Sequence, residues 1–582
     1  MLQLLLGGSG SGKTTLLYQR IRARAEKGKK SILLVPEQFT SSTEGRIYRE
    51  LGDALSGMVE SFSFTSLAEK ILSTEGGAAV QTLSDAGRAV LVRRALEELQ
   101  DNVHYYHRHR RSAAFCQMAA QTIDELKSAG LSGQQLTQLA GACGAESGKL
   151  SELALIFQGY ETLLARSGMD PSDRLELAGA RLEEALARHS LPEFLRDRAV
   201  FIDEFDTFNA PKKRLLGVML AALPSVTVAL CDDGAPLLPG DLSLFSGAKQ
   251  VAAQLRQLAR KNGAEVAVPQ LLRKDLRHRN APGLAAVAEL LETGSCTADA
   301  PAGEVRLFAA PSREEEARAA AGAIRRLMRQ GVRCGKIAVV CRDIAKYRAA
   351  VRYEFRMAEI PLYCDEPTTP EFSAPATAVR ALLEIARGAD LTENLTTLAK
   401  TGLCALSEEQ VCALENYAYT WAPTAAAWRE KFERSPKGFG EQELTEEDLR
   451  NREQAEYARA LLVGAVDAFR AKVRGVNAEA ISRAVYFCLK TLGAEEQQAA
   501  QVKAIRAGRG IPAAEEAARE WNVVMGLLNE MAHLLGEQTV TVAEYEDLFG
   551  LLLRSSDLGH IPQTLDAVVL ASAGKMRLDA PD

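Results

Sequence analysis

The residues whose types and spacing are best suited to chemistry stand close to the start of the chain. Positions 7–15 read GGSGSGKTT and fit the pattern G-x-x-x-x-G-K-[ST]. In such a loop the glycines let backbone N–H groups point at phosphate oxygens, the lysine bridges the β- and γ-phosphates, and the next hydroxyl ligates Mg²⁺. We therefore expect a nucleotide site, with Lys13 catalytic and Thr14 on the metal. Its binding residues are Gly7, Gly8, Ser9, Gly10, Ser11, Gly12, Lys13, Thr14 and Thr15.

A pair of acidic residues, Asp203 and Glu204, follows the apolar run at 199–202. A strand would deliver both carboxylates at its carboxyl end. There Asp203 would hold the Mg²⁺ shell and Glu204 would polarise the attacking water. Acids also follow strands as ordinary turn residues, and a glycine- and serine-rich turn can arise by chance. The nucleotide interpretation is favoured because the complete loop motif follows a strand pattern and opens a helix.

The elements that must position these residues alternate between strand and helix patterns. A helix over 14–27, between two apolar runs, predicts a parallel strand–helix–strand unit. Helical spacing then dominates 80–190, so the first α/β domain is predicted to be interrupted by a helical block. Residues 263–303, with scattered Gly, Pro and Ala, are predicted to form a linker. The predicted strands of this half lie at 2–6, 31–35, 199–203 and 226–233.

A second α/β unit is predicted after the linker, with a charged helix over 314–331. Its predicted strands lie at 305–310, 336–342, 360–365 and 564–574. A second helical block runs from about 376 to 553. The expected fold class is α/β, with two parallel-sheet domains that each carry a large all-helical insertion, the second α/β domain being incomplete. The expected domains are 1–78 with 191–290, 79–190, 300–375 with 556–582, and 376–555.

The composition is that of a globular protein. The chain has 582 residues, 47% of them hydrophobic and 25% charged, with a net charge of −6. These values exclude a largely disordered or collagen-like chain but allow a local basic groove. The start has no signal-peptide pattern, and no apolar run reaches the roughly 18 residues of a membrane span. The ten cysteines form no CxxC pair, so reduced thiols in a cytoplasmic protein are expected.

Placed in order, the motifs resemble those of superfamily 1 helicases of the UvrD type, whose two RecA-like P-loop domains carry helical insertions. VPEQFTSSTE at 35–44 stands at the place of motif Ia, and SFSFTSL at 61–67 at that of motif Ib. In both motifs, hydroxyl and backbone groups contact the phosphates of single-stranded DNA. Arg342 matches the motif IV arginine, which reaches the γ-phosphate. The implied DNA contacts are Gln38, Thr40, Ser63, Thr65, Ser66 and, near motif V, Lys575.

A closer resemblance is to the AddB-type subunits of the bacterial AddAB helicase–nucleases. It rests on LLLGGSGSGKTT, ILLVPEQFT, SFTSLAEKIL, FIDEFDTF, IPLYCDE and VVLASAGKMR. It implies ATP and Mg²⁺ as cofactors, DNA as substrate, and an AddA-type subunit with the active motor as the partner in a heterodimer without membrane contact. Such complexes resect double-strand breaks and respond to Chi sequences. A nuclease domain with an iron–sulfur cluster is implied only beyond Asp582, so the chain is expected to be the N-terminal half of a larger subunit.

Several departures from the helicase pattern affect the expected activity. Asp233 is followed by Gly-Ala-Pro, without the glutamine of motif III, and DEFD at 203–206 lacks the glutamine of DExxQ. The chain also stops before any motif VI arginine. A competent strand-separating motor is therefore not expected from this chain alone. ATP binding with slow or conditional hydrolysis, in a DNA-binding scaffold, is expected instead.

Two other classes of function stay open at this point. One is a P-loop ATPase or kinase that acts on a small molecule or a protein and has no connection with DNA. The other is an interaction scaffold whose nucleotide site is vestigial. The second α/β unit with Arg342 argues against the first, since small-molecule kinases rarely need a second lobe with a helical insertion. The complete set of Lys13, Thr14, Asp203 and Glu204 argues against the second.

Overall fold

The structure is a computed structural model in which the chain forms two compact units. Unit 1 comprises Met1–Leu83, Gln121–Ala154 and Gly168–Ala309, and unit 2 comprises Ser84–Ala120, Leu155–Ser167 and Ala310–Asp582. Each is described by itself. The four-domain division stays a proposal. The described residues are 1–77, 82–110, 112–144, 147–295, 304–364, 369–389, 391–440, 443–536, 539–556, 558 and 566–573.

Unit 1 is built on a six-stranded sheet in which all neighbouring strands are parallel. The order of the strands is β3-β2-β4-β5-β1-β6. A strand between two neighbours that is covered on both faces is apolar along its whole length, as in LQLLLG and AVFI. The bounds are β1 Leu2–Gly7, β2 Ser31–Leu34, β3 Val59–Phe62, β4 Ala199–Ile202, β5 Ser225–Cys231 and β6 Gln270–Leu272.

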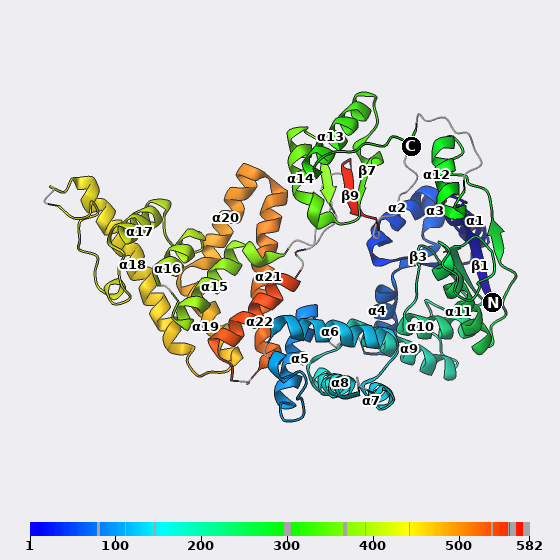
Figure 1. Cartoon of the computed structure of the whole chain (residues 1–582), viewed down its shortest axis with the longest axis horizontal. Helices are drawn as coiled ribbons and strands as arrows, with labels where there is room; N and C mark the ends of the chain where they lie inside the picture. The colour runs from blue at the N-terminus through cyan, green and yellow to red at the C-terminus, as the bar shows by residue number, and fades with distance from the viewer. Residues whose placement is uncertain are drawn as a thin grey trace. The chain divides into compact units, whose positions relative to one another are not determined.

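Successive side chains of the central strands enter two different cores. Leu4 of β1 belongs to a core with helices α4, α9, α10 and α11, whereas Leu5 belongs to one with α1 and α2 (Figure 1). Helices therefore cover both faces of the sheet, as expected for a parallel sheet. The helices that lie wholly in unit 1 are α1 Lys13–Ala25, α2 Thr40–Leu51, α3 Asp53–Ser56, α4 Phe64–Glu75, α7 Gly133–Ala140, α9 Pro171–Ala187, α10 Ala210–Ala222, α11 Ser246–Lys261 and α12 Pro282–Thr293. Both units contain part of α6 Ala113–Ser128 and of α8 Ser147–Ser167.

Unit 2 contains a smaller parallel sheet and a large helical block. The sheet has the order β7-β9-β8, and Val568 and Leu570 of β9 pack into a core with helices α13 and α14. The bounds are β7 Ala338–Cys341, β8 Leu362–Cys364, β9 Val568–Ser572, α13 Arg313–Arg329 and α14 Ile344–Met357. The sequence places the last strand of this sheet more than 200 residues after the other two, because the helical block lies between them. The expected α/β class with parallel sheets and helical insertions is confirmed.

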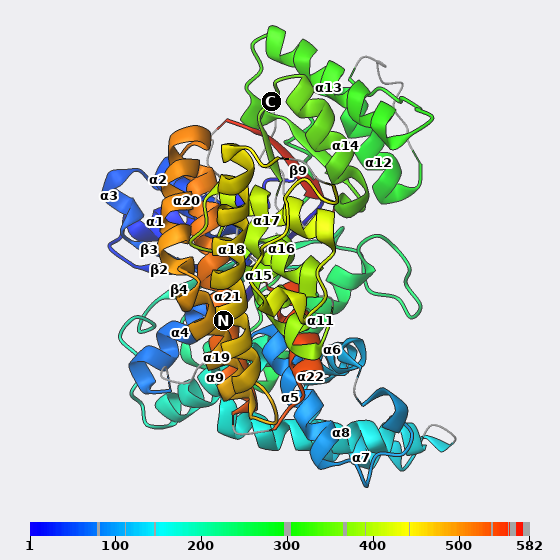
Figure 2. The same cartoon turned by 90° about the vertical axis from the view of Figure 1, so that its left-hand side faces the viewer.

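The helical block of unit 2 begins several of its helices with reciprocal caps. At the start of α22, for example, Glu544 N donates to Thr541 Oγ1 over 3.2 Å while the Glu544 carboxylate accepts from Thr541 N. Figure 2 shows this block, including the neighbouring α17 and α18. Its helices are α15 Ala374–Arg387, α16 Leu391–Lys400, α17 Glu408–Trp421, α18 Glu446–Lys472, α19 Ala478–Thr491, α20 Ala494–Arg509, α21 Ile511–Leu535 and α22 Val542–Ser555.

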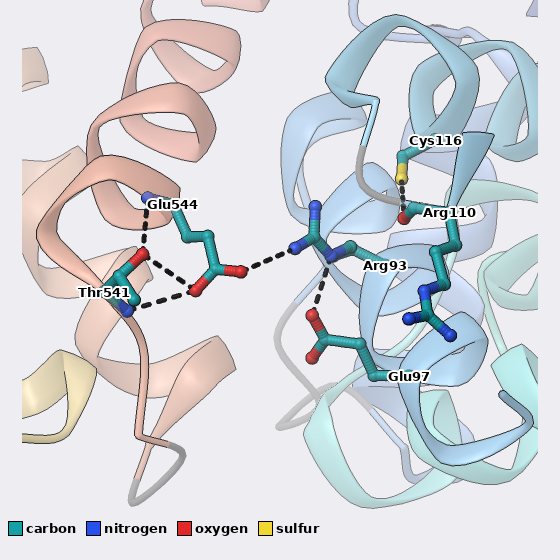
Figure 3. A network of polar contacts seen from close by, with 6 residues as sticks. All are labelled: Arg93, Glu97, Arg110, Cys116, Thr541 and Glu544. Atoms are coloured by element: carbon teal, nitrogen blue, oxygen red, sulfur yellow. Dashed lines mark hydrogen bonds and ion pairs between the residues drawn. The ribbon is translucent and has the colours of Figure 1, made fainter. Parts of the chain in front are cut away.

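Helix α5, Asp85–Glu98, packs against this block through a polar network (Figure 3). The buried Arg93 donates to Glu97 Oε1 over 2.8 Å and to Glu544 Oε1 over 3.3 Å. Nearby, Cys116 Sγ donates to the Arg110 carbonyl over 3.9 Å. Burial raises the pKa of the Cys116 thiol to about 12, so it stays protonated and unreactive.

Two expectations about elements are wrong. The predicted linker contains β6, which pairs with β1, and the helix α12. Residues 305–310, predicted as a strand, have no strand partner among the described residues, and Leu307 and Phe308 are exposed. A strand forms only where a neighbour accepts its hydrogen bonds, so three residues beside β1 form one and a longer apolar run without a partner does not. Of the helices that the structure describes, none combines the length and apolar character needed to cross a bilayer.

Candidate nucleotide site

The glycine-rich loop connects β1 to α1 at the carboxyl edge of the unit 1 sheet. Gly10 and Gly12 have φ angles of 77° and 86°, which side chains other than glycine rarely adopt. A Cβ atom on Gly10 would also lie 2.7 Å from Arg277 Cβ. The loop closes through a hydrogen bond of 3.3 Å from Ser11 N to Gly8 O, and α1 begins at Lys13. The predicted strand–loop–helix arrangement is therefore present.

Lys13 points back into its own loop. Its Nζ donates to the carbonyl oxygens of Gly7 and Gly8 over 2.8 Å and 2.7 Å. Burial lowers the pKa of the Lys13 ammonium, the charge of Asp203 partly offsets this, and that of Arg277 lowers it further. A cation held by two carbonyls in a partly buried loop is available to an anionic phosphate, which can replace those carbonyls.

Asp203 directly follows β4 and is buried, with 6% of its surface exposed. Its N–H donates to Leu34 O over 3.1 Å, and its Oδ1 accepts from Glu204 N over 3.0 Å. Glu204 has a φ of 67°, unusual for a residue with a side chain. Strand β5 lies between β4 and β1, so Asp203 is two strand spacings, about 10 Å, from the end of β1. That separation suits a phosphate group and a metal ion between the two motifs.

The strand between these two motifs ends in a second pair of acids. Asp232 N donates to Gly7 O over 3.2 Å, and Asp232 Oδ1 accepts from Gly234 N over 2.7 Å. Burial raises the pKa of the Asp232 carboxyl. Asp233 forms an ion pair with Lys249 at 3.2 Å. The carboxyl ends of three adjacent strands therefore meet beside the loop.

Sequence reasoning missed Arg277. Strand β6 carries the chain past the loop, where Leu276 N donates to Gly10 O over 3.0 Å and Arg277 Nη1 donates to Ser9 Oγ over 3.4 Å. Asp275 accepts a hydrogen bond of 3.1 Å from Arg277 N, which fixes the turn. The basic run RKDLRHR at 273–279 was the available signal, but it fell within the predicted linker.

The predicted DNA-contacting residues have mixed surroundings. Ser63 and Ser66 cap the start of α4: Ser63 Oγ accepts from Ser66 N over 3.0 Å, and Ser66 Oγ accepts from Ser63 N over 2.8 Å. Thr40 Oγ1 donates to Glu37 O over 3.0 Å, and Thr65 is exposed. Lys575 and the side chain of Gln38 lie outside the described residues. All six stay predictions.

Arg342 follows β7 in unit 2 and is exposed. Its predicted reach to a γ-phosphate also stays a prediction. No three His, Cys, Asp or Glu side chains converge as a metal site among the residues that the structure describes.

The residues present fit a nucleotide with Mg²⁺. Ser11 Oγ is buried and has no hydrogen-bond partner in the described part of the chain, which leaves an unsatisfied polar atom within the loop. Thr14, in the first turn of α1, is half-buried and next to Lys13. A hydroxyl, an ammonium, the positive end of a helix and a carboxylate two strands away are the donor set that a metal-bound phosphate needs.

Comparisons with known proteins agree with the motif order. Residues 4–288 match the family model described as "ADDB, N-terminal". The chain is 30% identical to the AddB-type subunits of the ATP-dependent helicase/deoxyribonucleases of Desulforudis audaxviator and Moorella thermoacetica, over 99% of this chain and 51% of each relative. It is 29% identical to the corresponding protein of Symbiobacterium thermophilum, with the same coverage. The chain thus spans about half the length of the curated relatives it matches.

Proposed function

The chain belongs to the family of AddB-type helicase/deoxyribonuclease subunits, and from that premise we propose that it forms the helicase-like, ATP- and DNA-binding part of such a subunit. The complex would resect DNA double-strand breaks for recombinational repair. Its partner would be an AddA-type subunit that carries the active motor.

One observation carries the ATP-binding part of this proposal. The phosphate loop, Asp203 and Arg277 converge on the carboxyl edge of one parallel sheet, although more than 260 residues separate the first from the last. Ligands of open parallel sheets bind at this edge. A vestigial site would have no need to keep a buried lysine and a buried carboxylate within electrostatic reach of each other.

Each residue has a distinct role in the proposed site. The amine of Lys13 would leave the carbonyls of Gly7 and Gly8 and bind the β- and γ-phosphates. Thr14 and Asp203 would hold Mg²⁺, which when bound neutralises charge on the phosphates. Glu204 would orient the attacking water. Arg277, already bonded to Ser9, stands where it can add a positive charge at the phosphates.

The proposed activity is limited by what the loop after β5 lacks. Asp233, where helicases of the UvrD type continue to a glutamine, is engaged with Lys249 and is followed by Gly-Ala-Pro. The glutamine that would couple the phosphate site to a DNA strand is therefore missing from this loop. We propose that the chain binds ATP, hydrolyses it slowly or conditionally, and leaves strand separation to its partner.

The DNA part is tested by binding of a fluorescent forked oligonucleotide, with and without an AddA-type subunit. We expect salt-dependent binding, because phosphate contacts release counterions. A duplex of equal length without the fork is the control for end and strand preference. No binding at low salt, even with the partner present, would exclude a role on DNA and favour an ATPase of another class.

A further inference from the structure

Unit 2 has an open groove that none of the motifs accounts for. It has a volume of about 770 Å³ and lies along α14 and the start of β8. Arg352, Tyr353, Arg356 and Glu359 line it, together with the apolar residues Ile360 and Pro361. The wall is therefore a mixture of two cations, one anion and an aromatic ring over an apolar floor.

The two arginines of the groove are exposed and form no hydrogen bond or ion pair with any described residue. They are four positions apart, so they lie on one face of α14, about 6 Å apart along its axis. Several other polar side chains of α13 and α14 are paired. These pairs are Arg318 with Glu354 at 3.0 Å, Tyr347 with Glu316 at 2.6 Å and Lys346 with Asp343 at 3.0 Å.

Unpaired positive charge thus gathers at the groove, while several neighbouring charges of the two helices are neutralised. Of the side chains that line the groove, Glu359 alone opposes this charge. Two adjacent like charges repel each other, and a polyanion in the groove would reverse that repulsion. The charge complement of the groove is a chain of phosphates.

Tyr353 narrows the choice of polyanion. It lies next to Arg352 on α14, lines the same groove, and is 53% exposed. Proteins that bind single-stranded nucleic acids combine a positive groove for the backbone with exposed aromatic rings on which bases stack. An acidic protein surface would use the arginines but has no need of an open aromatic face.

We propose that this groove binds a single strand of DNA, with Arg352 and Arg356 on its phosphates and Tyr353 stacked on a base. The inference rests on the proposed DNA function and adds to it a strand-binding site in unit 2. None of Gln38, Thr40, Ser63, Thr65, Ser66 and Lys575 belongs to this site.

The test measures binding of the 582-residue chain to fluorescein-labelled oligo(dT) by anisotropy, over a range of salt concentrations. In the Arg352→Ala/Arg356→Ala variant, the slope of log K against log salt should become shallower by about 1.4, or about 0.7 for each arginine that no longer binds a phosphate. The matched control, Arg326→Ala/Arg329→Ala, removes the same charge from exposed positions of α13 and should keep the wild-type slope. Circular dichroism verifies that both variants are folded.

A second pair of variants tests the stacking. Tyr353→Ala should weaken binding about tenfold with little change in salt slope, and Tyr353→Phe should bind like the wild type. An unchanged slope in the groove variant, or an equal change in the control, would overturn the groove while leaving the DNA function intact. Absence of salt-dependent binding by the wild type would overturn both. Intact DNA binding by the groove variant, together with a failure to associate with an AddA-type subunit, would identify the groove as a protein-docking surface instead.

Discussion

At the scale of residues, the nucleotide site is a set of short local signals joined by one distant one. The loop at 7–15 and the acids after β4 could be predicted because each needs only its own neighbours in sequence. Arg277 could not, because it reaches Ser9 through the pairing of β6 with β1. A three-residue strand has too little sequence pattern to reveal such a pairing.

The loop glycines give a sharp prediction at this scale. Gly10→Ala should abolish ATP binding while the protein stays folded, because φ is 77° and the new Cβ would meet Arg277 Cβ at 2.7 Å. Gly28→Ala is the matched control: its φ is 69°, but nothing lies within 4 Å of the added atom. Both variants share the backbone strain, and only the first changes the site. Equal ATP affinity in the two, measured by titration calorimetry, would show that the packing of Arg277 on the loop does not matter.

At the scale of elements, helical patterns predicted the existence of helices better than their partners. The apolar stripe of α5 specifies a buried face but not which helices cover it. Its packing on α21 and α22 depends on polar contacts such as Arg93 with Glu544, between residues more than 400 positions apart (Figure 3). The segment 305–310 shows the converse, since an apolar run without a neighbouring strand stays irregular.

The contact between α5 and α22 predicts a measurable loss of stability. Glu544→Ala removes one carboxylate from the buried Arg93 and also the reciprocal cap at Thr541, so we expect about 2 kcal/mol of destabilisation. Asp547→Ala, an exposed position on the same helix, should change stability by less than about 0.5 kcal/mol. Denaturant unfolding followed by circular dichroism compares the two. Equal unfolding midpoints would mean that the network in Figure 3 contributes nothing.

At the scale of the whole molecule, composition and motif order predicted the class but not every connection. The parallel sheets and helical insertions follow from the alternation of patterns along the chain, and they are present. The net charge of −6 describes the sum of 70 basic and 76 acidic residues and hides local excesses, such as the two arginines on α14. A charge total therefore says little about where a polyanion binds.

The central claim is that this chain binds ATP through the loop after β1. The most direct measurement is a titration of the wild type and of Lys13→Ala with a fluorescent ATP analogue and Mg²⁺. The account predicts binding by the wild type and about 100-fold weaker binding by Lys13→Ala, because charge-assisted hydrogen bonds to phosphate are removed. Lys27→Ala, an exposed lysine two residues beyond α1, should bind like the wild type. Equal affinity of Lys13→Ala and wild type would contradict the account.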